Sequence, residues 1–372
     1  MLIPVFTIYA TQLKGANYSL IGLALGSYGL SQGLLQIPFG MLSDRFGRKP
    51  IITIGLILFA CGSLLGALTQ SISGMIIARI LQGTGAIGSV LIALVADLTT
   101  IADRTKAMAI IGITIGLSFN LSLIISPIIT HSFGLSGIFY LTFVLALFGL
   151  IILYTMVPTP QNPTTHTAIS KRSNFKDVLY DKQLMSLNMG IFCQHAILTA
   201  TFYVLPRLLQ QQIAIGRLTE SWYFYLPIML LTFIIMLPLI TIAEKKHRAH
   251  QLFIACIITT LATEFILSFT NTSWMFICVL VFAYFIAFNI LEASLPSLIS
   301  KQATADRKGT AMGIYSSCQF LGMFAGGALA GLVYAHVNSA GVFILNAAIA
   351  CLWLAVSLRN AVNCRPYDTN AT

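Results

Sequence analysis

Long apolar runs constrain this chain more than any other feature. Stretches of about 20 largely uncharged residues recur along it, and each can cross the ~30 Å hydrocarbon core of a bilayer as a helix. Lipid offers no partner to an unpaired backbone group, so a spanning segment must be a helix or part of a closed barrel. Barrel strands alternate apolar and polar residues, whereas runs such as ITIGLILFACGSLLGALT do not. The sequence therefore predicts an all-α membrane protein.

The composition agrees with this prediction. Of 372 residues, 57% are hydrophobic and 9% are charged, and the mean hydropathy of +0.87 is far above that of soluble proteins. The seven cysteines are scattered and show no spacing typical of a metal site or a disulfide framework. No nucleophile elbow or phosphate-binding loop occurs in a suitable context, so we expect a protein that is not an enzyme and needs no metal or cofactor.

Hydropathy and turn signals predict twelve transmembrane helices. Their expected ranges are 1–14, 18–40, 50–69, 73–96, 106–130, 134–157, 184–208, 220–243, 251–270, 273–299, 309–335 and 339–359. The first is too short to span and has neither the basic leader nor the cleavage site of a signal peptide. We interpret it as a truncated first helix whose start lies upstream; a genuine short start is the alternative.

The distribution of charge predicts the orientation. The net charge of +10 could indicate a nucleic-acid partner, but 17 of the 21 Lys and Arg residues lie on one side if the loop at 40–50 is cytoplasmic. The other side keeps only Lys14, Arg79, Arg207 and Arg217. Cytoplasmic loops are enriched in Lys and Arg. We therefore expect a multi-pass protein of the cell inner (cytoplasmic) membrane, with a cytoplasmic C-terminus and no nucleic-acid partner.

The chain divides into two similar halves. The expected units are an N-terminal six-helix bundle at 1–157, a cytoplasmic linker at 158–183, a C-terminal six-helix bundle at 184–359 and a cytoplasmic tail at 360–372. Pro38 precedes Asp44 as Pro238 precedes Glu244, and ADRTKAM at 102–108 resembles ADRKGTAM at 305–312. Both pairs share an offset of about 200 residues, which indicates an internal repeat with conserved orientation.

Three motifs of the first half carry family information. The loop at 40–50 contains Gly40, Leu42, Asp44, Arg45, Gly47, Arg48 and Lys49, and the predicted fourth helix contains Arg79, Gln82, Gly83 and Gly85. In the fifth, Ser126-Pro127 stands where a Gly-Pro pair is expected. With these motifs the chain resembles the major facilitator superfamily of secondary transporters, most closely its drug:proton antiporters. The resemblance implies a twelve-helix fold of two pseudo-symmetric six-helix bundles around a midplane cavity.

The loop at 40–50 is interpreted as a gating latch. Topology alone explains its cations but not Asp44 or its glycines, and a helix N-terminus favours a nearby anion. The resemblance implies that Asp44 docks against the eleventh helix when the transporter faces outward, and Asp97 is placed to pair with Arg48. The expected latch residues are Gly40, Asp44, Arg45, Gly47, Arg48, Lys49 and Asp97. A topology signal without gating is the alternative.

Ionisable residues inside the membrane are the candidates for proton coupling, because they are costly to bury there. Glu264 and Glu292 are the carboxylates within predicted spans. The resemblance implies that the tenth helix lines the cavity and the ninth lies at the periphery, which favours Glu292. His195 titrates near neutrality, and Arg79 could tune a proton site. Packing is the alternative for Glu292 and His195, as lipid snorkelling is for Arg79.

GTGAIG at 83–88 matches a dinucleotide-binding fingerprint, but it lies within an apolar span rather than after a strand. Close helix packing at small residues is the better interpretation. The same interpretation applies to four glycines of the predicted eleventh helix, which are Gly322, Gly326, Gly327 and Gly331.

Candidate cavity residues are Gln82, Phe119, Phe192, Tyr203, Tyr284, Phe288 and Tyr315. Aromatic groups suit a lipophilic or cationic compound, although core packing is the alternative. We therefore expect a monomeric transporter that exports small hydrophobic or drug-like compounds against inward protons, driven by the proton gradient without a cofactor. An uptake symporter or uniporter for a metabolite is one alternative, and a non-transporting or decayed membrane protein is another.

Overall fold

The computed structural model describes residues 2–159, 177–269, 273–303 and 307–361, and within them the chain is almost entirely helical. The helices are α1 (Phe6–Tyr9), η1 (Ala10–Gln12), α2 (Tyr18–Phe46), α3 (Arg48–Leu68), α4 (Ile72–Thr84), α5 (Gly88–Leu98), α6 (Ile101–Thr155), α8 (Lys182–Ala214), α9 (Trp222–Lys245), α10 (Ala249–Leu267), α11 (Trp274–Gln302), α12 (Lys308–His336) and α13 (Ser339–Ala361). Most of the predicted linker and the tail from residue 362 lie outside the described residues.

Short polar side chains set where several helices begin. Asn17 accepts a hydrogen bond from the backbone N–H of Leu20 at the start of α2, and Ser71 accepts one from Gly74 at the start of α4. Asp181 accepts two backbone N–H bonds at the start of α8. Each cap satisfies backbone donors that have no partner within the helix, so the boundaries follow from local sequence.

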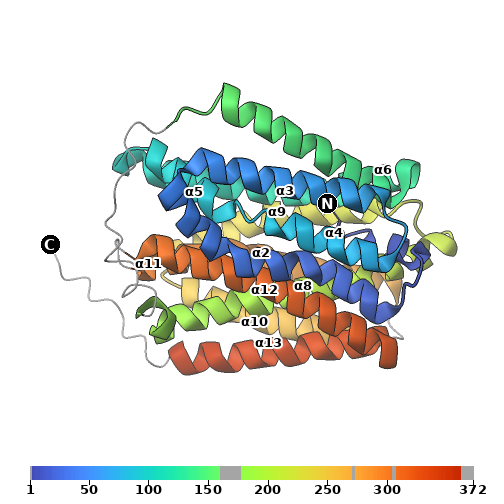
Figure 1. Ribbon diagram of the computed structural model, residues 1–372. Coiled ribbons are helices and arrows are strands. Elements are labelled where there is room, and N and C mark those ends of the chain that lie inside the picture. The colour runs from blue at the N-terminus through green and yellow to red at the C-terminus, as the bar shows by residue number, and fades with distance from the viewer. Residues whose placement is uncertain (1, 160–176, 270–272, 304–306, 362–372) are drawn as a thin grey trace.

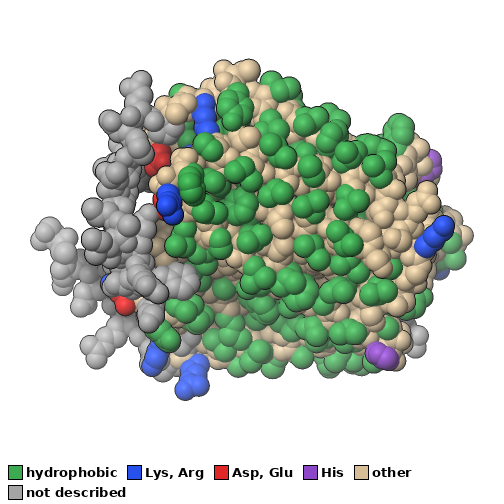
Figure 2. Space-filling view, in the orientation of Figure 1, with side chains coloured by type: hydrophobic (Ala, Val, Ile, Leu, Met, Phe, Trp, Pro, Cys, Tyr) green, Lys and Arg blue, Asp and Glu red, His purple; other side chains and the backbone are tan. Residues whose placement is uncertain are grey.

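Ten segments of the described chain are long and apolar enough to cross a membrane. The predicted fifth and sixth helices form one element, α6, which turns at Gly134, where φ is 61°. The predicted fourth helix is interrupted between Thr84 and Gly88 and becomes α4 and α5, and the predicted first helix is the short pair α1 and η1. Figure 2 shows hydrophobic side chains covering the middle of the visible face, with Lys and Arg toward its two ends.

The helices form two groups, α1 to α6 and α8 to α13, which meet along two seams (Figure 1). In one seam α2 packs against α12, and in the other α6 packs against α9. The two ends of the molecule are called the latch end and the cage end. The latch end contains the α2–α3 turn at Gly47, and the cage end contains Tyr18 and Arg207.

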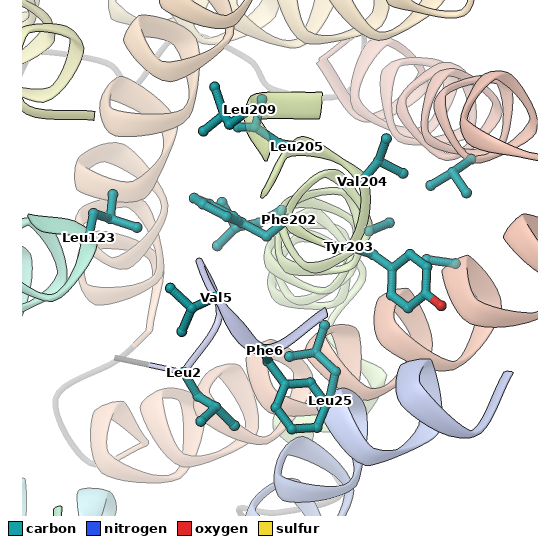
Figure 3. Close-up of a cluster of buried hydrophobic side chains, with 14 of the residues drawn as sticks. Leu2, Val5, Phe6, Leu25, Leu123, Phe202, Tyr203, Val204, Leu205 and Leu209 are labelled. Carbon is teal, nitrogen blue, oxygen red and sulfur yellow. The ribbon is translucent and has the colours of Figure 1, made fainter. Parts of the chain in front are cut away.

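The largest hydrophobic cluster joins the two groups (Figure 3). Phe6 of α1 and Leu25 of α2 belong to it together with Leu123 of α6 and Phe202 of α8, and each of these side chains is at most 3% exposed. Figure 3 shows Leu2, Val5 and Phe6 between α2 and α8. The short first segment therefore packs at the centre of the molecule, where it contributes to the contact between the groups.

Glycines allow α12 to lie against both α2 and α8. A Cβ at Gly322 or Gly326 would overlap the α8 backbone at Phe192 or Ala196, and a Cβ at Gly331 would lie 2.8 Å from Gly22 Cα of α2. The glycines that face each partner are spaced by four residues, which places them on one face of the helix. The expected role of these glycines, and of Gly83 and Gly85, in close helix packing is confirmed.

Gly22 offers a direct test of this seam. A methyl group there would meet the α12 backbone, with Gly331 Cα at 2.6 Å, so Gly22→Ala is expected to destabilise the protein by about 1–3 kcal/mol. The measurement is the unfolding midpoint of the detergent-solubilised protein. The control is Gly313→Ala in α12, where a Cβ has nothing within 4 Å. Equal midpoints for the two variants would contradict this account of the seam.

Candidate functional site

The α2–α3 turn brings most of the expected latch residues together. Gly47 separates the helices and has a φ of 92°, a backbone conformation that residues with a Cβ rarely adopt. Arg48 follows and bridges two acids, with its Nη1 2.7 Å from Asp44 Oδ1 and its Nε 2.8 Å from Asp97 Oδ2. It also donates a hydrogen bond to Ser43 Oγ. One guanidinium thus connects the end of α2 to the end of α5.

The other residues of the loop have different contacts. Lys49 Nζ donates a hydrogen bond to the carbonyl of Val157 beyond α6 and lies 5.9 Å from the centre of the Tyr154 ring. Arg45 lies over the Phe46 ring at 5.3 Å. A Cβ at Gly40 would meet Ser89 at an ordinary 3.5 Å, so close packing does not require glycine there. The docking of Asp44 on α12, and the gating role of the loop, stay predictions.

A polar cluster surrounds Glu292 between α8, α11 and α12. His195 Nε2 lies 3.8 Å from Glu292 Oε1, so the two would form an ion pair when the histidine is protonated. The side chain of His195 is 7% exposed and that of Glu292 is 35% exposed. Two of the three groups expected to take part in proton coupling are therefore neighbours, and the carboxyl is accessible. Their role in coupling stays a prediction.

Two glutamines complete this cluster, and the sequence reasoning missed both. Gln194 Nε2 donates to Glu292 Oε2 at 3.1 Å and to the carbonyl of Phe288 at 3.2 Å. Gln319 Nε2 lies 2.8 Å from His195 Nε2 and 3.4 Å from Glu292 Oε1. One amide therefore bridges the histidine and the acid. The sequence signal for both was an uncharged amide within an apolar helix, because a buried amide needs hydrogen-bond partners.

Arg79 lies in a second cluster within the first bundle. Its Nη1 donates to Gln82 Oε1 at 2.8 Å, and Gln82 Nε2 donates to Ser63 Oγ at 2.8 Å. The guanidinium carbon stands 4.7 Å from the centre of the Tyr28 ring. Arg79 is only 8% exposed, so its packing contacts are with protein rather than with lipid headgroups. Gln82 is held by this network between Arg79 and Ser63.

The expected cavity aromatics separate into groups. Phe119 of α6 contacts Phe288 of α11 across the two bundles, with ring centres 6.3 Å apart, and Tyr284 contacts Phe288 at 6.2 Å. Phe288 also lies 6.2 Å from the ring of His195. Tyr315 and Phe192 pack in the second-bundle core, and Tyr203 belongs to the cage described next. The first three aromatics therefore adjoin the Glu292 cluster, and substrate binding by the whole set stays a prediction.

The cage end is closed by one arginine among three tyrosines. The guanidinium carbon of Arg207 lies 4.5 to 5.0 Å from the ring centres of Tyr18, Tyr203 and Tyr334, which come from α2, α8 and α12. Arg207 also donates to the carbonyl of Thr7 at 3.2 Å, and Tyr203 Oη donates to the carbonyl of Tyr18 at 2.6 Å. We call these four residues the Arg207 cage. It joins the two bundles at the end opposite the latch.

Comparisons with known proteins agree with this architecture. Residues 1–327 and 228–365 match the Major Facilitator Superfamily. The chain is 43% identical over 361 residues to the inner membrane transport protein YajR of Escherichia coli (strain K12), covering 96% of this chain and 78% of that one. It is 26% identical to the quinolone resistance protein NorA of Staphylococcus aureus (strain MRSA252), covering 91% and 87%. A crystal structure of a D-xylose-proton symporter superposes with a TM-score of 0.77 at 15% identity, covering 96% and 92%.

The two groups of membrane-spanning helices, with a polar cluster inside the second group, and the match to transporters identify the chain as a membrane transporter rather than an enzyme. The chain belongs to the Major Facilitator Superfamily. It is a multi-pass membrane protein, and the expectations of the family, of an all-α major facilitator fold and of a transport role are confirmed. The count of twelve transmembrane helices stays a prediction, since ten candidate spans are found among the described residues.

The Arg207 cage makes a prediction about stability. Arg207→Ala removes the contact with three rings and the bond to Thr7, and the expected loss is about 1–3 kcal/mol, seen as a lower unfolding midpoint in detergent. Arg217→Ala is the control, because Arg217 is an exposed arginine beyond the end of α8. If both variants unfold at the same temperature, the cage does not stabilise this arrangement of the bundles.

Proposed function

We propose that this protein is a proton-coupled transporter of the inner membrane that exports small hydrophobic or drug-like compounds by alternating access. The observation that carries the proposal is the Glu292 cluster. A partly exposed carboxyl and a buried histidine lie 3.8 Å apart, next to aromatic rings contributed by both bundles. A titratable pair beside a lipophilic surface allows protonation and substrate binding to influence each other.

Alternating access follows from the two ends of the seam. The Arg207 cage joins the bundles at one end. The acid–arginine bridge, which lies within the first bundle, is at the other end, where Asp44 is expected to dock on α12. With the cationic loops placed in the cytoplasm, the cage faces outward and the latch faces inward. Rocking of one bundle against the other would break the contacts at one end as those at the other form.

Proton movement supplies the energy. Protonation of Glu292 removes its charge and its attraction to His195, which frees both groups to adopt different contacts. One charge crossing 100 mV provides ~2.3 kcal/mol, which supports roughly fiftyfold accumulation outside per proton. No cofactor is needed for such a cycle, and we propose that one chain performs it as a monomer.

The direction of transport separates the main alternatives. The name of NorA refers to quinolone resistance, which favours export of drug-like compounds. The name of the D-xylose-proton symporter refers to transport of a sugar together with protons, and a metabolite symporter of that kind is the main alternative. The aromatic character of the surface beside Glu292, formed by Phe119, Tyr284 and Phe288, supports the first of these.

Asp44 tests the latch. Asp44→Asn removes the charge that faces Arg48 at 2.7 Å while keeping the side-chain size, so we expect normal membrane insertion and at least a tenfold loss of transport. The measurement is export of a fluorescent lipophilic cation from cells that express each variant. The control is Asp103→Asn, which removes an acid at the start of α6. Unchanged export by the Asp44 variant would reduce the loop to a topology signal.

Glu292 tests coupling. Glu292→Gln keeps a polar side chain but cannot titrate, so transport in proteoliposomes should continue down a substrate gradient and lose its dependence on an imposed pH gradient. The probe is the same fluorescent cation, with its flux measured at equal and unequal pH. A flux that still responds to the pH gradient would place the proton site elsewhere. Wild-type uptake of the probe together with protons would overturn the export proposal.

A further inference from the structure

Glu264 of α10 lies in a polar site separate from the Glu292 cluster. Its side chain is fully buried, with 0% exposure. Oε1 lies 2.8 Å from Thr201 Oγ1 of α8, and Oε2 lies 2.9 Å from Asn346 Nδ2 of α13. Asn346 Nδ2 also donates to Thr201 Oγ1 at 3.0 Å. Three helices therefore meet at one carboxyl that no solvent reaches.

The hydrogen atoms of this site can be counted. Thr201 Oγ1 has a single hydrogen, and it lies 2.8 Å both from the carbonyl of Ile197 and from Glu264 Oε1. When this hydrogen goes to the backbone carbonyl, which has none to give, it is not available to the carboxyl. The contact between the hydroxyl and Glu264 is then a hydrogen bond only if the carboxyl donates. The geometry thus fits a protonated Glu264.

Within the described part of the chain, no cation is paired with Glu264. Among the described residues, Glu264 forms no ion pair, and the groups that bond it, Thr201 and Asn346, are neutral. Helix α9 has no acidic or basic residue before Glu244, and α13 has none before Arg359. On α8 Arg207 is held in the cage and His195 faces Glu292. A buried carboxylate without a cation is so costly that the neutral acid is favoured.

A small cavity lies beside the Glu292 cluster, where Gln194 lines it. It offers about 10 Å³ to the centre of a water-sized sphere and is lined by Gln194, Ile197, Thr260, Tyr284, Phe288, Leu291 and Trp353. Thr260 and Ile197 lie one turn before Glu264 and Thr201 on their helices. Gln194 Oε1 is buried without a hydrogen-bond partner in the described structure. Tyr284 Oη, which has no partner of good geometry there, lies beside Thr201. A water needs such polar partners.

We propose that Glu264, with Thr201 and Asn346, is a second proton-binding site, and that its proton exchanges through a water held in this cavity by Tyr284 and Gln194. In each exchange the carboxyl gives its proton to Thr201 Oγ1, the Thr201 hydroxyl gives its own to Tyr284 Oη, and Tyr284 gives one to the water. The reverse steps return a proton to the carboxyl, so no other bond changes. Because Gln194 also bonds Glu292, the water connects the two acids. This connection rests on the proposed proton coupling, whereas the proton on Glu264 can be measured without transport.

Infrared spectroscopy of the detergent-solubilised chain at neutral pH tests the bound proton. Wild type should show a carbonyl band of a protonated carboxyl that is lost in Glu264→Gln and kept in Glu244→Gln, which changes an exposed acid at the end of α9. If the glutamine variant does not fold, Glu264→Asp should shift the band instead. If neither Glu264 substitution alters a protonated-carboxyl band of the wild-type spectrum, Glu264 is charged and the proposal is overturned.

Hydrogen–deuterium exchange of the same band tests the water. Tyr284→Phe removes a hydroxyl that would hold it, and the band should exchange at least tenfold more slowly in D₂O. Tyr225→Phe is the matched control, since Tyr225 on α9 is also buried with an unpartnered hydroxyl but does not line the cavity. Equal exchange in both variants would overturn the role of the water. If the Glu264 band is present but transport does not respond to a pH gradient, the proposed function is overturned and the proton-binding site is not.

Discussion

The close approach of α12 to α2 and α8 is the interaction on which the rest of this structure depends. In lipid, apolar side chains gain little by leaving one apolar surface for another, so helices associate through backbone proximity and buried polar contacts. Gly322 and Gly326 admit α8, and Gly327 and Gly331 admit α2. Because α2 belongs to the first bundle and α8 to the second, α12 connects them through this close backbone contact, beside which the ring pairs Tyr18–Tyr334 and Tyr28–Phe320 also join α2 to α12.

The polar groups of the membrane-spanning helices are distributed along this seam. The Arg207 cage closes one end of it with rings from α2, α8 and α12. Gln319 of α12 contacts His195 of α8 near its middle, and the Arg48 bridge lies at the far end of α2. A movement of α12 would therefore change the surroundings of the titratable groups as well as the contacts at the ends. Coupling between proton binding and conformation needs such shared contacts.

The features that the bilayer imposes, such as apolar spans and charged ends, could be predicted from the sequence. The contacts between particular helices could not. Apolar length located the spans, and the pattern around Asp44, Arg48 and Asp97 predicted residues that lie together, because charge is confined to the membrane boundary. It did not predict the interruption of the fourth helix before Gly88. It also missed Gln194 and Gln319, since an amide in an apolar run does not reveal which helix will face it. The carboxyl of Glu264 was read as peripheral, yet its three-helix site emerges only from the packing.

The central claim is that the two bundles rock about the α2–α12 seam, and a pair of distances measured in one protein tests it most directly. On a cysteine-free background, spin labels at Gln70 and Ala214 report the cage end, and labels at Phe46 and Lys246 report the latch end; all four positions are exposed. Double electron–electron resonance in proteoliposomes at acidic and alkaline pH should show two distances for each pair. The fraction of molecules with the longer distance at one end should increase as the fraction with the shorter distance at the other end increases. A single unchanging distance for both pairs, or populations that lengthen together, would contradict the account.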